Sequence, residues 1–139
     1  MKAIKNILMT SAVIACTMLC LFSCTSKDML SIAVEACAEE CPMDLGGGLV
    51  MTDVTIQNGD VVYLYEMDEN SYDIASIKSD PITQALMKEA MLEELNNSSD
   101  KSLHDFIKIV RKSNADIIYR YVGSESGKGF DIVIDNSEL

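Results

Sequence analysis

The hydrophobic and polar positions divide this chain into segments with different periodicities. Apolar residues run from 7 to 22 with few interruptions, and the chain becomes polar immediately after Cys24. From Met29 to Glu40 apolar residues recur at intervals of three and four, which predicts a short amphipathic helix. From Leu49 to Asp68 the interval falls to two, which is typical of β-strands.

Asn58-Gly59 is the strongest turn signal in the chain, because both central residues of a type I′ turn need positive φ. It lies between the predicted strands Leu49–Gln57 and Asp60–Asp68. A two-residue loop pairs Ile56 with Val61, Val54 with Tyr63, Thr52 with Tyr65, and Val50 with Met67 on the face that we assign to the core. The opposite face would then carry Met51, Val62 and Leu64, and we interpret these three as a candidate docking surface.

The second half of the chain alternates between helical and strand-like patterns. Ile74 and Ile77 predict one helical turn, and Asp80-Pro81 predicts the start of a helix to about Leu95. A helix over about 100–113 would follow, and then strands over 116–122 and 130–135. The predicted core consists of Val54, Ile56, Val61, Tyr63, Phe106, Ile107 and Val110.

This order of helix, hairpin, two helices and hairpin predicts an α+β fold. We expect an antiparallel four-stranded sheet, built from two hairpins and packed against two central helices plus a short N-terminal helix. The glycine run 46–48 predicts a flexible connection. These patterns do not fix which strands are neighbours.

The N-terminal segment has the features of an export signal. Lys2 and Lys5 precede the apolar run, and a small residue, Ser23, precedes Cys24. This run of sixteen residues, interrupted by Thr10, Ser11 and Thr17, falls short of the about 20 that a membrane span needs. We therefore divide the chain into a signal peptide (1–23), an acylated tether with a short helix (24–40) and a single α+β domain (41–139). The alternative is an ordinary secretory signal, or a buried helix in which Cys24 is a packed thiol.

Leu21-Phe22-Ser23-Cys24 resembles the lipobox of bacterial lipoproteins. This resemblance implies that Cys24 becomes the acylated N-terminus, carrying fatty acids such as palmitate, and that the protein is anchored in the cell envelope. Thr25 stands where an Asp would favour retention in the inner membrane, so the resemblance also implies the outer membrane.

A second resemblance covers residues 41 to 134. Cys41-Pro42-Met43, the glycine run, the 52–63 segment, Asp80-Pro81 and Ile118-Tyr119-Arg120-Tyr121 together resemble a group of small lipoproteins of gut-type anaerobic bacteria. The resemblance carries no catalytic signature. It therefore implies a fold and a location but no activity.

Charge and cysteine content change the picture after the signal is removed. Nine basic and 22 acidic residues then remain, a formal charge of −13. This balance argues against nucleic acid and against anionic lipid surfaces as partners, because both attract clustered Lys and Arg. Cys37 and Cys41 are the cysteines left beside Cys24, and we predict that they form a disulfide if the helix ends near Cys41.

Candidate chemistry is sparse. His104 is the only histidine, and its neighbour Asp105 diverges from it by about 100° on a helix, so the two do not form a base and its orienting carboxylate. We predict no metal and no cofactor. The leading hypothesis is a non-catalytic, lipid-anchored envelope domain that binds an unknown envelope protein or polymer through its sheet. The alternatives are a small periplasmic or surface hydrolase and a purely structural envelope lipoprotein.

Overall fold

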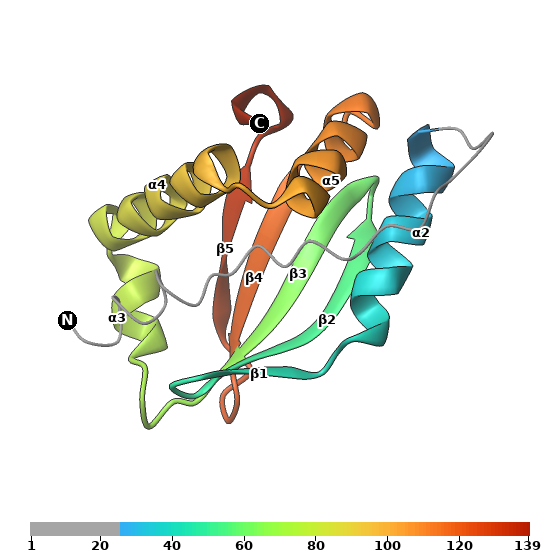
Figure 1. Cartoon of the computed structure of the whole chain (residues 1–139). Coiled ribbons are helices and arrows are strands. Elements are labelled where there is room, and N and C mark those ends of the chain that lie inside the picture. Colours follow the sequence, from blue (N-terminus) through green and yellow to red (C-terminus); the bar gives the residue numbers. More distant parts are fainter. Residues whose placement is uncertain (1–25) are drawn as a thin grey trace.

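The computed structural model describes residues 26–139, which form one sheet with helices packed against one side of it (Figure 1). The elements in chain order are α2 (Ser26–Glu39), β1 (Met43–Gly46), β2 (Leu49–Gln57), β3 (Asp60–Met67), α3 (Ile74–Ser79), α4 (Pro81–Asn97), α5 (Lys101–Lys112), β4 (Ile117–Gly123), β5 (Gly129–Ile134) and the 3-10 turn η1 (Asn136–Glu138). The predicted signal peptide and Cys24 lie outside the described residues.

The sheet has five strands in the order β1-β2-β3-β4-β5. Strands β3 and β4 run parallel, and the other neighbours are antiparallel. The α+β class is therefore confirmed, whereas the predicted four antiparallel strands are wrong. The two hairpins lie side by side in the sheet, and α3, α4 and α5 connect β3 to β4. A crossover connection of this kind brings the next strand back in the parallel direction.

The fifth strand, β1, lies where the sequence predicted a flexible connection. Gly46, Gly47 and Gly48 all have positive φ, 80°, 63° and 83°, so the glycine run makes a tight turn between β1 and β2. A Cβ at Gly48 would lie 2.9 Å from the Cβ of Asp68. The glycine run therefore makes a defined turn rather than a flexible connection, and Gly48 also permits a close approach of two chain segments.

The predicted β2–β3 hairpin is confirmed at its turn. Ile56 pairs with Val61 and Val54 with Tyr63, and Asn58 has the expected positive φ of 52°. A bulge between Met51 and Asp53 then shifts the register, so that Met51 pairs with Tyr65. Beyond the bulge, each β2 residue lies on the face opposite to the one we predicted.

Aspartate caps begin helices α4 and α5, and the cap at Asp80 is the one that the sequence predicted. The Asp80 carboxylate accepts hydrogen bonds from Ile82 N at 3.0 Å and Thr83 N at 3.3 Å, and Pro81 occupies the first turn of α4. Asp100 caps α5 by accepting from Ser102 N at 2.8 Å. These caps satisfy backbone N–H groups that have no partner within the helix.

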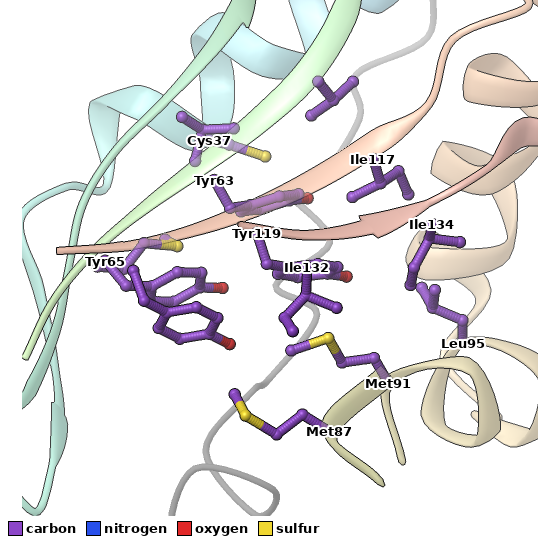
Figure 2. Close-up of a cluster of buried hydrophobic side chains, with 14 of the residues drawn as sticks. Cys37, Tyr63, Tyr65, Met87, Met91, Leu95, Ile117, Tyr119, Ile132 and Ile134 are labelled. Atoms are coloured by element: carbon purple, nitrogen blue, oxygen red, sulfur yellow. The ribbon is translucent and has the colours of Figure 1, made fainter. Parts of the chain in front are cut away.

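A row of stacked aromatic rings forms the centre of the core (Figure 2). The ring centroids of Tyr63 and Tyr119 are 5.4 Å apart, those of Tyr65 and Tyr121 are 5.0 Å apart, and Phe130 extends the row at 5.2 Å from Tyr121. All four tyrosines are buried. Methionines of α4 belong to the same core cluster.

Five of the seven predicted core residues are buried: Val54, Val61, Tyr63, Phe106 and Val110. Ile56 and Ile107 are only half-buried and pack against the edge of the core. On α5 the inward position belongs to Ile109 instead, which is 6% exposed. The helix is therefore rotated slightly from the face that its spacing predicted.

Candidate functional site

The side of the sheet away from the helices is open. Along β4 buried and half-exposed residues alternate, so Ile118, Arg120 and Val122 face outward while Tyr119 and Tyr121 face the core. The register aligns the outward residues in rows across four strands. One row is Thr55, Val62, Ile118 and Val133, and the next is Asp53, Leu64, Arg120 and Asp131. We call these eight residues the open face.

The two rows differ in chemistry. The first is largely apolar, and its edge residue Val133 is 42% exposed. The second carries charges, with Arg120 at its centre. The Arg120 guanidinium donates from Nε and Nη2 to the two oxygens of Asp131, at 2.9 and 3.0 Å. It also donates from Nη1 to Gln57 Oε1 at 3.0 Å.

Arg120 therefore spans the sheet, because Asp131 lies on β5 and Gln57 lies on β2. The Arg120 side chain must reach across β3 to join these partners. This accounts for the complete burial of Val62, a β3 residue on the side of the sheet that has no helices. The bidentate pair holds a planar guanidinium flat against the open face. An interaction partner would thus meet an ordered polar centre beside an apolar row.

The three residues predicted for docking have different positions. Met51 is completely buried on the core side, because the bulge at Met51 and Asp53 reverses its orientation. Val62 is on the open side but is covered. Leu64 is on the open side and partly exposed. The docking prediction is thus wrong for Met51, and Leu64 is the accessible member of the set.

Sequence reasoning missed Arg120 and Asp131 as members of this surface. The signal was present in the alternation Tyr119-Arg120-Tyr121, because a charged residue between two core tyrosines must face the other side of its strand. The pairing with Asp131 could not be read without the β4–β5 register.

Apart from the open face, the domain has a concave region of about 850 Å³ between the loop after β3, helix α3 and the β4–β5 loop. Glu69 closes it on one side. Its carboxylate accepts from Glu125 N and Ser126 N, both at 2.7 Å, and from Ser126 Oγ at 2.6 Å. The Ser126 hydrogen bonds hold the pKa of Glu69 below its usual value. Glu69 therefore acts as a clamp between two loops and is poorly suited to be a proton acceptor.

The candidate chemical groups do not converge on a reactive centre. His104 is exposed on α5, and its Nε2 is hydrogen-bonded to the carbonyl of Ser98, which ties the α4–α5 connection. In the part of the chain that the structure describes, no group of three His, Cys, Asp or Glu side chains could hold a metal ion. Within residues 26–139, no helix has both the length and the apolar composition that crossing a bilayer requires.

The predicted disulfide is not formed in the structure. Cys41 is a free thiol, and its Sγ donates to the carbonyl oxygen of Cys37 at 3.7 Å. The helix does end before Cys41, as expected. However, the Cys37 side chain is completely buried, whereas Cys41 is partly exposed beyond the end of α2. Burial raises the pKa of the Cys41 thiol.

No family model and no curated protein matches this chain. Solved structures do resemble its fold. A Pseudomonas aeruginosa protein assigned to the secreted class aligns with a TM-score of 0.56 at 10% identity, covering 84% of this chain and 98% of its own. EpsS, a pilotin of the type II secretion system of Vibrio vulnificus, aligns with a TM-score of 0.53 at 11% identity, covering 81% and 90%.

The Vibrio cholerae type II secretion pilotin AspS aligns in the same way, with a TM-score of 0.53 at 10% identity over 82% of this chain and 92% of its own. At these identities the likeness shows the fold alone. The alignments cover 90% or more of each neighbour, so the arrangement of sheet and helices described here makes up nearly the whole of these three bacterial proteins.

Proposed function

We propose that this protein is a lipid-anchored, non-catalytic binding module of the bacterial cell envelope, attached through Cys24, with an envelope protein as its partner. The observation that carries the proposal is the open face, a four-strand-wide surface that the helices leave uncovered. The lipobox-like Leu21–Cys24 supports the location. The fold shared with two secretion-system pilotins supports a role in the envelope.

The open face indicates the chemistry of its partner. Its apolar row offers Ile118 and Val133 for contact. Acidic groups lie beside that row, including Asp53, Glu66 and Asp131. A partner that fits has apolar side chains at its centre and Lys or Arg at its rim, since complementary charges at a rim mainly steer association and select the partner.

Site-specific photo-crosslinking in cells tests the docking surface. A photoreactive residue at Leu64 or Val133 should capture one envelope protein, and the same residue at Ile82 should not. Ile82 is a matched control because it is 71% exposed but lies on α4, on the helical side of the sheet. Capture should disappear in the Val133→Asp variant and persist in Ile82→Asp. Capture from Ile82 alone would move the binding surface to the helices and overturn the proposal.

Fatty-acid labelling tests the anchor separately. An alkyne-bearing fatty acid should label the wild-type protein and leave Cys24→Ala unlabelled. If the Cys24→Ala protein is still labelled, another residue carries the lipid.

A further inference from the structure

The basic residues of this acidic protein are not evenly distributed. Lys108, Arg111 and Lys112 are exposed at i, i+3 and i+4 positions along α5. This spacing places them on one face of the helix, opposite the buried Phe106 and Val110. None of the three takes part in an ion pair among the described residues, whereas Lys88, Lys101 and Arg120 each pair with a carboxylate.

A fourth cation, Lys27, belongs to the first turn of α2, and α2 begins at the end of the molecule where α5 ends (Figure 1). Lys27 and Leu30 line one hollow, of about 410 Å³, with the β2–β3 turn and with Asn114. Lys108, Arg111 and Lys112 line an adjacent hollow of about 480 Å³ together with the C-terminal turn. Helices α2 and α5 also pack against each other. We call Lys27, Lys108, Arg111 and Lys112 the basic end.

The basic end is also where the chain leaves toward the predicted anchor. Helix α2 begins at Ser26, two residues after Cys24. Two residues of fully extended chain span at most about 7 Å. Any lipid on Cys24 therefore holds this end of the domain next to the headgroups.

Acidic groups also lie near this end, and several of them are engaged. Glu138 of the C-terminal turn pairs with Lys88 at 2.9 Å, and Asp105 pairs with Lys101 at 2.8 Å. Asp60 accepts from Asp116 N at 2.9 Å, and Asp116 accepts from Asn136 N at 2.8 Å. Asp28 follows Lys27 in α2. The formal charge of −13 on the mature chain argued against anionic lipid, but that sum does not show that four cations gather at one end of the domain. Cations in the last turn of α5 also interact favourably with the helix dipole. That effect does not explain the positions of Lys108 and Lys27, which lie outside this last turn.

We propose that the basic end lies against the anionic headgroups of the membrane in which Cys24 is anchored. This inference rests on the proposed function, because it takes the lipid anchor as given. The contact orients the domain. The strands run away from this end, so the sheet stands out from the bilayer and its open face remains accessible from the side (Figure 1).

Lysine footprinting on vesicles tests this orientation directly. The acylated mature protein is reconstituted on vesicles of phosphatidylcholine alone, or of phosphatidylcholine with phosphatidylglycerol, and labelled with an amine-acetylating reagent. Since each cation near an anionic surface contributes about fivefold to its partitioning, acetylation of Lys27, Lys108 and Lys112 should fall at least about threefold on the anionic vesicles. Salt at about 1 M shortens the Debye length to about 3 Å and should restore the acetylation of these lysines.

The chain supplies its own controls. Lys78 and Lys128 line the 850 Å³ concavity away from the basic end and should be labelled equally on both vesicles. Arg111→Gln should raise the labelling of Lys108 and Lys112 on anionic vesicles, and the matched Arg120→Gln should not. Equal labelling of the basic end on both vesicles would overturn the inference. The same protection by inorganic phosphate on neutral vesicles would also overturn it, because the site would then bind soluble anions.

Failure of the anchor has a different signature. An acylated protein floats with phosphatidylcholine vesicles at about 1 M salt and shows the added mass of its lipid. Loss of that flotation refutes the anchor, whereas intact flotation with an unprotected basic end refutes the orientation alone.

Discussion

The two faces of the sheet are built from alternate residues of the same strands but differ in nearly every physical property. On the inner face, Tyr119 and Tyr121 stack in a row that the helices cover. On the outer face, Arg120, between them in sequence, lies flat and partly exposed in a polar network. Packing of apolar area dominates the first face, and hydrogen bonds open to solvent dominate the second.

This difference separates stability from binding. Side chains on the inner face are removed from water and should contribute most of the folding free energy. An exposed ion pair such as Arg120–Asp131 contributes about 0.2–1 kcal/mol. The outer face can therefore change to suit a partner while the fold remains intact, and the predictions that follow try to break that division.

Alkaline pH should unfold the protein through its inner face. Burial raises the pKa values of Tyr63, Tyr65, Tyr119 and Tyr121 well above the usual value of about 10. In the unfolded chain these phenols ionise near pH 10, but in the folded chain they stay protonated. The tyrosine contribution is therefore fully present below about pH 10 and is lost as the pH rises above it.

Denaturant unfolding measured from pH 7 to pH 11 checks this expectation. Stability should fall steeply above about pH 10, and Tyr119→Phe should reduce the slope. A flat profile would show that the tyrosine hydroxyls reach water in the native state.

Tyr119→Ala should cost about 3–5 kcal/mol, because it removes a fully buried ring and leaves a cavity in the aromatic row. Its outward neighbour provides the comparison. Ile118→Ala should cost about 1 kcal/mol, since Ile118 is only half-buried. Both values come from urea unfolding with circular dichroism. Equal losses would erase the distinction between the faces.

Gly123→Ala should cost about 1–3 kcal/mol through overpacking at the end of the inner face. A Cβ on Gly123 would lie 2.7 Å from Ile74 Cδ1 and 2.7 Å from Glu69 Cδ, so the ends of both side chains must shift and the Glu69 clamp is disturbed. Ser124→Ala, at the next and exposed position, is the control and should leave the melting temperature nearly unchanged. An unaltered melting temperature in Gly123→Ala would indicate that the clamp is loose.

Tyr121→Phe should have the smallest effect, within about 1 kcal/mol, and can even stabilise the fold. The Tyr121 hydroxyl is buried and has no hydrogen-bond partner among the described residues. Removing it relieves the cost of desolvating an unpaired polar group while keeping the stacked ring. A thermal melt is sufficient to measure the difference. A loss well above 1 kcal/mol would mean that the hydroxyl is hydrogen-bonded in solution.

The sequence predicted the local elements better than their assembly. The Asn58-Gly59 turn and the Asp80 and Asp100 caps were identifiable because turns and caps depend on a few adjacent residues. The parallel pairing of β3 with β4 was not, because it depends on contacts between distant segments. Strand β1 was missed since four residues beside three glycines carry almost no periodic signal.

The candidate site was predicted only in part, for a related reason. The side-chain period of a strand is two, so the one-residue bulge between Met51 and Asp53 placed Met51 in the core and left Leu64 outside. A bulge has no reliable signature in a single sequence. The basic end was equally hidden, because Lys27 and Arg111 come to the same end of the domain only when α2 and α5 are packed together.

The parallel β3–β4 pair also has a consequence for how the chain is made. Asp60 and Asp116, which begin the pairing, are 56 residues apart in the sequence. The hydrogen bonds between β3 and β4 cannot form until the three intervening helices have been synthesised. Closing so long a loop costs conformational entropy before the new contacts offset it. During synthesis β3 must therefore wait with one edge unpaired. Strand edges in this condition are sites of aggregation, so we expect the nascent protein to depend on holding factors until β4 arrives.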